Sequence, residues 1–530
     1  MKELFRKYPV YCVMVFVTLC IAPVLVMRDF TPANELRYLS IADEAIAKGH
    51  ILAFTNHGET YADKPPLYFW ILMLCRLLFG RYSMAVLSLF SLVPAFVTVA
   101  VMDRWTLREA SPLTRAASAM MLLTTALFLG LAVYVRMDML MCMFIVLALY
   151  SFWKERYTLF GLFTFLALFT KGPVGLLLPL MAAVIYLVTS GRDRELPKVF
   201  DWPFWAVLGG LSMVWLVGAY WEGGWEYLSN LLFYQTLGRA VNAFHHKAPF
   251  WFYAAVIWGV AAPWCLLTIP AVGVVLIRRR DSLRERLFSR KDRSCLFSWT
   301  VVSGFVMLSL FSSKLAIYLL PLLPFLSYVF VRVVRKAGWE IWMRRNMSLT
   351  TILFALTGIA MVVGFFFFNR LRIPSNYAFA RTPLLILAGL IVLSGSILAL
   401  IHVQDSWQRP VLILGASLLL GVASLTPLLP AVNEVTGYRG ICKEMQTVAP
   451  GGKVYAIGLS RPESMDVYLG RPVEALDPNL LLRNPAILPQ EAGVVLSKDL
   501  DAVASFRYSG ILKKSGRTCA FETELYSFWR

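Results

Sequence analysis

Long apolar segments recur along the chain, with short polar connections between them. Thirteen segments are predicted to cross a membrane, because a hydrocarbon core about 30 Å thick requires roughly 17–25 mostly apolar residues in a helix. The predicted spans cover residues 8–27, 83–102, 115–134, 138–153, 157–170, 172–189, 204–220, 252–277, 295–312, 315–331, 348–368, 383–402 and 410–429. The pattern therefore predicts a mainly α-helical, polytopic membrane protein of about 13 transmembrane helices.

The segment Pro65–Phe79 is apolar but only about fifteen residues long, and it contains Arg76. Such a length is typical of a helix that lies along the membrane surface. With this segment outside the membrane, the short polar segments on the side of the N-terminus carry 25 Lys and Arg residues, against 14 in the short segments on the other side. The longer region after Pro430 is not counted, because long domains contribute little to the charge rule. Because positive residues concentrate in cytoplasmic loops, we expect the N-terminus in the cytoplasm and the C-terminus outside it.

The pattern changes after about Pro430. Strand-like runs at Lys453–Ile457 and Gly493–Leu496 alternate with turn residues, and one helix is expected near Val435–Val448. These features predict a small extracytoplasmic α/β domain over 431–530, behind a transmembrane domain over 1–430. Cys442 and Cys519 lie in this region, where they either pair or remain free thiols.

Composition agrees with this division. Hydrophobic residues make up 58% of the chain and charged residues 16%, which excludes an ordinary soluble protein. The net charge of +19 could indicate a nucleic-acid partner. However, the basic residues lie in short segments between apolar runs, as in Arg278-Arg279-Arg280, so no nucleic-acid partner is expected.

The first long loop, residues 28–82, carries the main chemical motif. Thr31 and Pro32 are suited to begin a helix. This helix contains the run Asn34-Glu35-Leu36-Arg37-Tyr38, and a second run, Tyr61-Ala62-Asp63-Lys64-Pro65-Pro66, follows later in the loop. The order and spacing resemble the first periplasmic loop of the GT-C membrane glycosyltransferases. The nearest branch contains the lipid A aminoarabinose transferases and the protein O-mannosyltransferases.

Four further segments resemble motifs of the same branch. They are Tyr134–Asp138, Phe169–Pro173, the region from Tyr234 to Trp251, and Ser312–Pro321. The topology derived from charge places all four on the same side as the first loop. Ionisable residues at a membrane edge are energetically costly, so their clustering on one surface indicates a functional site.

The resemblance implies an inverting glycosyltransferase that takes a sugar from a polyprenyl-phosphate donor. The expected acceptor is lipid A, another glycolipid or a protein, and the expected location is the bacterial inner membrane. A monomer is expected. Two alternatives remain open, namely a protein O-glycosyltransferase of the same fold and a transporter or flippase of lipid-linked sugars.

Such a reaction needs a carboxylate to accept the proton of the acceptor hydroxyl and cations to bind the phosphate. Asn34 stands where the aminoarabinose transferases have Asp, so Glu35 and Asp138 are the candidate catalytic residues, and Glu35 is favoured as the base. The candidate substrate-binding residues are Asn34, Arg37, Tyr61, Asp63, Lys64, Arg136, Lys171, Arg239, His246, Lys314 and Tyr318.

Some relatives use a histidine in the segment that corresponds to Tyr234–Trp251 to bind a metal together with the acid of the first loop. Thr236 occupies that position in this chain. No metal site is therefore predicted, and no cofactor is expected with certainty.

Overall fold

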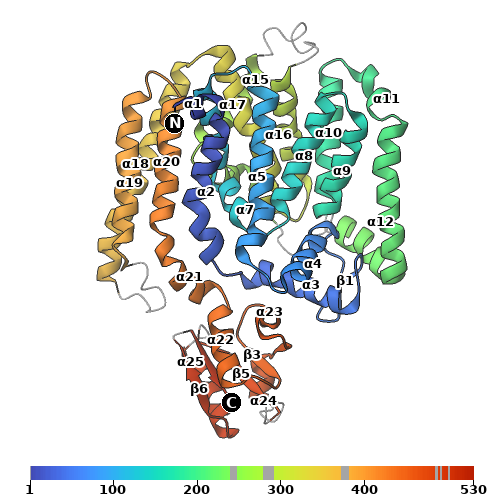
Figure 1. Cartoon of the computed structure of the whole chain (residues 1–530), viewed down its shortest axis with the longest axis vertical. Coiled ribbons are helices and arrows are strands. Elements are labelled where there is room, and N and C mark those ends of the chain that lie inside the picture. Colours follow the sequence, from blue (N-terminus) through green and yellow to red (C-terminus); the bar gives the residue numbers. More distant parts are fainter. Residues whose placement is uncertain are drawn as a thin grey trace.

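The computed structural model describes residues 2–238, 248–278, 292–371, 381–483, 488–489, 492–498, 502–523 and 525–530. A bundle of apolar helices forms most of the molecule, and a small sheet-containing unit projects from one end (Figure 1). The N-terminus lies at the opposite end of the bundle. The prediction of a polytopic helical membrane protein with a small α/β unit is confirmed.

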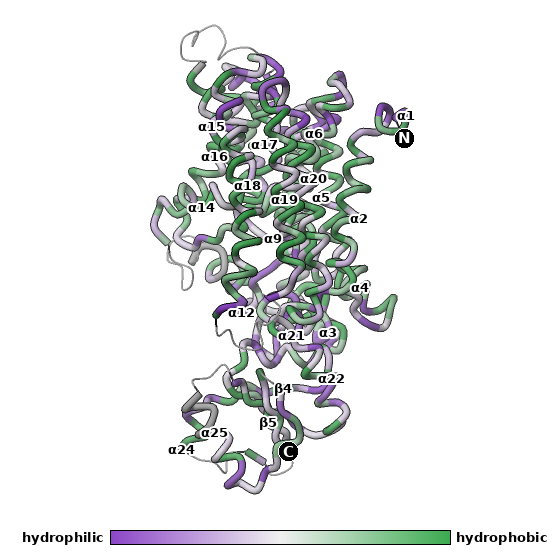
Figure 2. The backbone as a smooth tube through the Cα atoms, turned by 90° about the vertical axis from the view of Figure 1, so that its left-hand side faces the viewer, coloured by the Kyte–Doolittle hydropathy of each residue, from purple (hydrophilic) through white to green (hydrophobic). Residues whose placement is uncertain are grey.

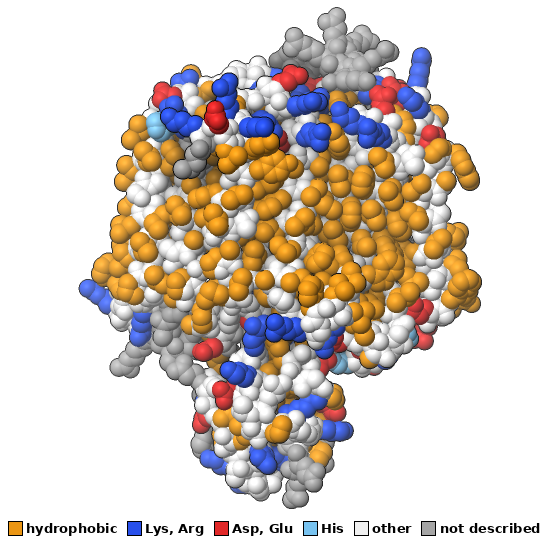
Figure 3. Space-filling view, viewed as in Figure 1, with side chains coloured by type: hydrophobic (Ala, Val, Ile, Leu, Met, Phe, Trp, Pro, Cys, Tyr) orange, Lys and Arg blue, Asp and Glu red, His pale blue; other side chains and the backbone are white. Residues whose placement is uncertain are grey.

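Among the described residues, eight helices are long and apolar enough to cross a membrane, or nine if one bent pair counts as a single span. These spans contain α2 (Pro9–Met27), α5 (Met84–Thr106), α12 (Trp202–Ser229), α16 (Arg293–Leu310), α17 (Leu323–Ala337), α18 (Ile341–Arg370), α19 (Leu384–His402) and α20 (Gln408–Ser424). Helix α17 has 15 residues and reaches the length of a span only together with the preceding residues from Ala316. Hydrophobic residues fill the middle of the bundle along the backbone (Figure 2), and their side chains form a broad apolar belt with polar residues at both ends (Figure 3).

Three predicted spans correspond to shorter helices inside the same bundle. These are α8 (Asp138–Trp153), α9 (Tyr157–Lys171) and α10 (Pro173–Thr189), with 16, 15 and 17 residues. They stand beside the longer helices in Figure 1. The count of thirteen spans remains a prediction.

Two segments predicted as single spans are broken. The segment 115–134 forms α6 (Pro112–Leu123) and α7 (Ala126–Val133), whose axes differ by 72°. The backbone N–H of Ala126 bonds the carbonyl of Ala262, 2.7 Å away, instead of continuing the first helix. The segment 252–277 forms α14 (Phe252–Val260) and α15 (Cys265–Arg278). Pro263 falls between them, and proline cannot donate a helix hydrogen bond.

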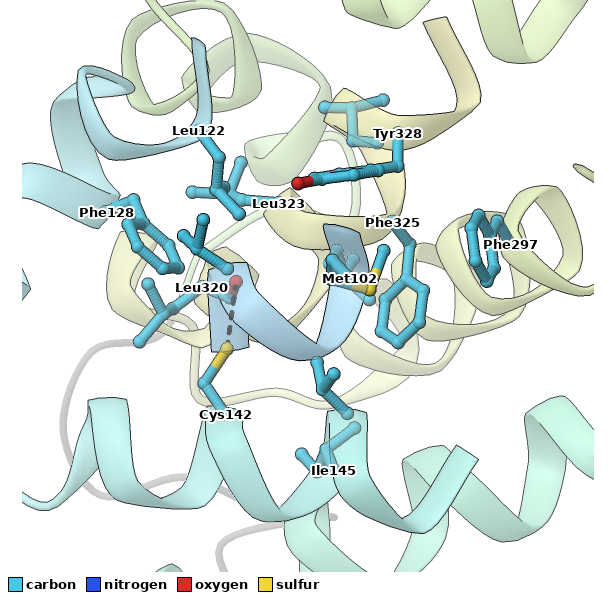
Figure 4. Close-up of a cluster of buried hydrophobic side chains, with 14 of the residues drawn as sticks. Met102, Leu122, Phe128, Cys142, Ile145, Phe297, Leu320, Leu323, Phe325 and Tyr328 are labelled. Carbon is cyan, nitrogen blue, oxygen red and sulfur yellow. Dashed lines mark hydrogen bonds between the residues drawn. The ribbon is translucent and has the colours of Figure 1, made fainter. Parts of the chain in front are cut away.

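Helix packing at the centre of the bundle relies on close apolar contacts. Figure 4 shows Met102, Phe128, Cys142 and Tyr328 gathered between helices that are far apart in the sequence. The Cys142 thiol points at the carbonyl of Leu320 in the 3-10 helix η4 (Ala316–Leu322), at 3.9 Å. Cys142 thus packs as a small buried hydrophobe.

The first loop forms a layer at the end of the bundle nearest the C-terminal unit (Figure 1). Its elements are the π-helical turn η1 (Pro32–Leu36), α3 (Arg37–Lys48), the hairpin strands β1 (Phe54–Asn56) and β2 (Glu59–Tyr61), and α4 (Leu67–Phe79). Helix α4 has 13 residues, too few to span a bilayer, and packs against α3. Phe69 of α4 contacts Tyr38, Phe54 and Tyr61 through ring edges and tilted faces. These aromatic contacts fix the loop as one folded layer.

The C-terminal unit contains a five-stranded sheet in the order β4-β3-β5-β7-β6. The strands are β3 (Val454–Ile457), β4 (Val473–Ala475), β5 (Gly493–Ser497), β6 (Cys519–Glu522) and β7 (Tyr526–Trp529). Strand β3 pairs in parallel with β4 and β5, while β7 is antiparallel to β5 and β6. Helix α22 (Arg439–Val448) lies where a helix was expected. Cys442 is buried and Cys519 is exposed, and both are free thiols.

Asp29, just after α2, ties this unit to the bundle. Its carboxylate accepts hydrogen bonds from the Arg439 backbone N–H at 3.0 Å and from the Tyr468 hydroxyl. Its backbone N–H donates to the Asn433 side chain at 2.9 Å. A Cβ added at Gly437 would collide with the Asp29 carboxylate, so glycine is required for this approach.

Candidate functional site

A cavity of about 410 Å³ opens between the first-loop layer, the ends of the bundle helices and the C-terminal unit. Its lining combines cationic, aromatic and amide side chains with one carboxylate. The lining residues are Asn34, Arg37, Tyr38, Asp63, Lys64, Arg136, Lys171, Tyr234, Ser313, Leu315, Ile317, Tyr318 and Arg461. Seven of the predicted site residues therefore meet in one cavity, although they come from distant parts of the chain.

Asp138 forms the innermost charge cluster, behind the cavity wall. It is fully buried at the start of α8, and its two oxygens pair with the Arg136 guanidinium at 2.9 Å and with the Lys171 ammonium. Lys171 also lies 4.8 Å from the ring centre of Tyr318. One carboxylate thus holds two cations at the cavity, and the net charge of the three side chains is positive.

Asp63 and Lys64 form a second pair, on the cavity wall itself. The Lys64 ammonium lies 2.9 Å from the Asp63 carboxylate, which also accepts a bond from the Tyr61 hydroxyl at 3.3 Å. Both side chains are about one-sixth exposed. The pair lies on the short connection between β2 and α4, where Pro65 and Pro66 stiffen the backbone.

Arg37 supplies a further cation at the start of α3. Its guanidinium lies 5.6 Å from the ring centre of Tyr38 and 5.7 Å from that of Tyr61. Its Nε is buried and makes no hydrogen bond to the described residues. Stacking against two rings fixes the orientation of the guanidinium and leaves donors available to a bound anion.

Glu35 is not among the residues that line the cavity. The side chain is completely buried. Its oxygens accept hydrogen bonds from the Arg28 guanidinium, from the Thr31 backbone and hydroxyl, and from the Val135 backbone N–H at 2.8 Å. The Glu35 carboxylate is thus enclosed by its own hydrogen-bond partners, and its role as the base remains a prediction.

Two other predicted residues are not cavity residues. Lys314 is buried, and its ammonium donates to the carbonyl of Phe311, while its neighbours Ser313 and Leu315 line the cavity. Tyr61 does not line the cavity but contacts two residues that do, because its hydroxyl donates to Asp63 and its ring lies against the Arg37 guanidinium. Arg239 and His246 lie outside the described residues.

Sequence reasoning missed four polar cavity residues, which are Tyr38, Tyr234, Ser313 and Arg461. Tyr38 follows Arg37 directly in the first-loop motif, Tyr234 begins the segment that ends at Trp251, and Ser313 lies in the segment Ser312–Pro321. Membership of a motif segment could therefore have indicated all three. Arg461 belongs to the C-terminal unit and has no sequence signal. Its backbone has a positive φ of 54°, which is unusual for a residue with a side chain.

No group of three or more His, Cys, Asp or Glu side chains suited to a metal ion occurs among the described residues. The absence of a metal site remains a prediction. The chemistry available at the described cavity is cation-assisted binding of an anion beside a single carboxylate.

Comparison with known proteins agrees with this architecture. No family model matches the chain. The crystal structure of ArnT from Cupriavidus metallidurans bound to undecaprenyl phosphate superimposes with a TM-score of 0.74, over 98% of this chain and 97% of that chain, at 17% identity. The apo structure of the same protein gives a TM-score of 0.72. This chain has the ArnT fold.

Curated relatives carry a consistent name, undecaprenyl phosphate-alpha-4-amino-4-deoxy-L-arabinose arabinosyl transferase. The protein from Edwardsiella ictaluri is 26% identical over 348 residues, which are 62% of this chain and 60% of that protein. The protein from Shewanella sediminis is 25% identical over 412 residues, or 73% of this chain and 70% of that protein. The matched region thus spans about 60–70% of the length of these relatives. The resemblance inferred from the first-loop motif is confirmed.

Proposed function

We propose that this protein transfers a sugar from a polyprenyl-phosphate donor to an extracytoplasmic acceptor, either lipid A or another glycolipid. The observation that carries this proposal is a single cavity, at the end of the apolar bundle, that combines several cations with one accessible carboxylate. A lipid-phosphate donor has an anionic leaving group and an apolar tail, so it requires both features. The names of the curated relatives and the ArnT fold support the same reaction class.

The leaving phosphate is bound by the cations of the cavity wall. Lys64, Arg37 and Lys171 are the nearest candidates, because each presents donors at the cavity and each is held by a neighbouring side chain. Charge-assisted bonds to phosphate oxygens strengthen as negative charge develops on the leaving group. These cations therefore favour departure of the phosphate as well as binding of the donor.

Asp63 is the carboxylate that accepts the proton of the acceptor hydroxyl. It faces the cavity, whereas Asp138 is fully enclosed by Arg136 and Lys171, and Glu35 lies behind the wall. The acceptor oxygen attacks the anomeric carbon opposite the phosphate, so a new C–O bond forms as the bond to the phosphate oxygen breaks. The hydroxyl proton passes to Asp63, and the configuration at the anomeric carbon inverts.

The protein acts as a monomer in the bacterial inner membrane, with the cavity and the C-terminal unit on the periplasmic side. The excess of basic residues in the short segments on the side of the N-terminus supports this orientation. Lys and Arg side chains gather at that end of the bundle in Figure 3. Under this proposal, residues 1–430 form the transmembrane catalytic domain and residues 431–530 the periplasmic domain.

Mass spectrometry of lipid A and surface glycans tests the proposed function. A deletion strain should lose one sugar-bearing species, and the wild-type gene should restore it. The Asp63→Asn variant should fail to restore it while reaching the membrane at a normal level. Unchanged lipid A and glycans in the deletion strain would contradict the proposal, and purified protein that moves the donor across vesicles without forming product would indicate a transporter instead.

A further inference from the structure

A second cavity, of about 470 Å³, lies between the C-terminal unit and the bundle, and it shares no residue with the first. One wall is formed by the end of α2 and the segment that begins α5, and the other by α22 and Tyr468. The lining residues are Val26, Arg81, Tyr82, Ser83, Met84, Ala85, Arg439, Cys442, Lys443, Gln446 and Tyr468. The cavity thus lies where helices of the apolar belt meet the polar unit.

The charged lining of this cavity is entirely cationic. Arg81, Arg439 and Lys443 line it without any carboxylate. Arg439 has a partial partner in Asp29, at 3.4 Å, whereas Arg81 and Lys443 form no ion pair with the described residues. Three cations around one cavity repel each other, and a bound anion would relieve that repulsion.

Helix α22 presents its cations to the cavity through one continuous face. Arg439, Cys442, Lys443 and Gln446 follow the spacing of three and four residues that aligns side chains on a helix. Arg439 and Lys443 are therefore neighbours of like charge, which by itself destabilises a helix. Gln446 adds an amide and Tyr82 a hydroxyl, so the wall can donate hydrogen bonds as well as charge.

The other side of the cavity continues into the lipid-facing surface. Val26 of the lining is 64% exposed, and Leu19 on the same helix is 70% exposed. Leu89 and Val93 of α5, which follow the lining residues Met84 and Ala85, are about half exposed. Helices α2 and α5 pack together, so these apolar side chains border one surface that leads to the cations. Figure 3 shows Lys and Arg side chains gathered where the apolar belt meets the C-terminal unit.

We propose that this cavity binds the phosphate headgroup of an anionic membrane phospholipid, whose acyl chains lie along α2 and α5. The combination of three cations with an adjoining exposed apolar surface fits an anionic lipid and fits neither a soluble anion nor a neutral lipid. A lipid held here bridges the start of α5 and α22 through its headgroup. The site is separate from the donor cavity and does not depend on the proposed transfer reaction.

Binding of dioleoyl phosphatidylglycerol to the full-length protein in neutral detergent micelles tests the site. The variant carries Arg81→Gln and Lys443→Gln, and its matched control carries Arg483→Gln and Lys514→Gln, two exposed cations elsewhere on the C-terminal unit. Each lost cation is expected to weaken binding about fivefold, so the test variant should lose roughly thirty-fold in affinity. The control should lose less than about twofold, because general surface charge contributes little.

Three further measurements define the outcome. Lys443→Arg should keep the wild-type affinity, and dioleoyl phosphatidylcholine should bind far more weakly than phosphatidylglycerol. Glycerol 3-phosphate should not compete at similar concentrations, because it lacks the acyl chains. Equal losses in the test and control variants, no loss in either, or full competition by glycerol 3-phosphate would overturn the proposal. Unchanged melting temperatures of both variants establish that the chain remains folded.

Discussion

Glu35 and Arg28 form a two-bond ion pair inside the protein. Oε1 of the carboxylate lies 2.6 Å from one guanidinium nitrogen, and Oε2 lies 2.7 Å from the other. Burial raises the cost of both charges, while Glu35 raises the pKa of Arg28 and keeps its guanidinium charged. The pair joins the end of α2 to the turn that begins the first-loop layer, and the Val135 N–H extends it to the segment before α8.

Glu35→Gln is expected to destabilise the protein without removing the proton acceptor. An uncompensated buried charge costs about 3–5 kcal/mol when its partner is removed, and Arg28 would become such a charge. Thermal unfolding in detergent should therefore show a clear decrease in melting temperature. Glu59→Gln, an exposed change in the same layer, is the control. Normal stability combined with abolished transfer would return Glu35 to a role in the chemistry.

Asp63→Asn is expected to abolish turnover while leaving donor affinity within a few-fold of wild type. A positioned base contributes about 10²–10⁴-fold in rate, and an amide of the same shape cannot accept the proton. Single-turnover kinetics and equilibrium binding of the polyprenyl-phosphate sugar separate the two effects. Wild-type turnover in this variant would exclude Asp63 as the base.

Lys64→Ala is expected to weaken donor binding strongly, because the leaving phosphate loses a charge-assisted partner. Lys64→Arg should restore only part of the affinity, since the planar guanidinium presents its donors in a different geometry. Lys48→Ala removes a cation from the same layer that pairs with Glu44 instead of lining the cavity. Binding isotherms for the three variants check the prediction, and equal losses for Lys48 and Lys64 would indicate a general electrostatic effect.

The sequence predicted the helical membrane fold because span length and charge asymmetry depend on local composition. It also predicted most cavity residues, because the first-loop motif brings Arg37, Asp63 and Lys64 together within one folded layer. It could not distinguish Glu35 from Asp63 as the accessible carboxylate. That distinction depends on Arg28 and Val135, which are close to Glu35 only after folding.

The breaks in two predicted spans were missed for a similar reason. Hydropathy is continuous across Thr124 and Thr125, whereas the change of direction involves a backbone bond from Ala126 to Ala262. Arg461 could not be assigned to the cavity because its place depends on how the C-terminal unit docks. Ser40 of α3 and Asp466, five residues after Arg461, form a 2.7 Å hydrogen bond in that docked interface.

Asp466 is the titrating group at this interface. Burial raises its pKa to about 6, against an ordinary value of 3.8, although the bond from Ser40 offsets part of the effect. His57, 3.8 Å away, also lowers the pKa, and Asp43 raises it. The folded protein therefore favours the protonated carboxyl. Its contribution to stability is present in full below about pH 4 and is lost as the pH rises through 6.

Asp466→Asn should remove this pH dependence. The amide keeps the shape and stays neutral, so the variant should gain melting temperature relative to wild type as the pH rises from 4 to 7.

Glu44 has the opposite behaviour, because hydrogen bonds from Lys48, Thr55 and the hairpin backbone outweigh burial and lower its pKa to about 2. The stability that Glu44 contributes is therefore lost only as the pH falls below the ordinary pKa of a glutamate, and it is lost equally in the wild type and in the Asp466→Asn variant. Thermal unfolding of both proteins across this range measures the difference, with the exposed change Asp193→Asn as the control. A difference that stays constant with pH would show that Asp466 does not titrate at the interface.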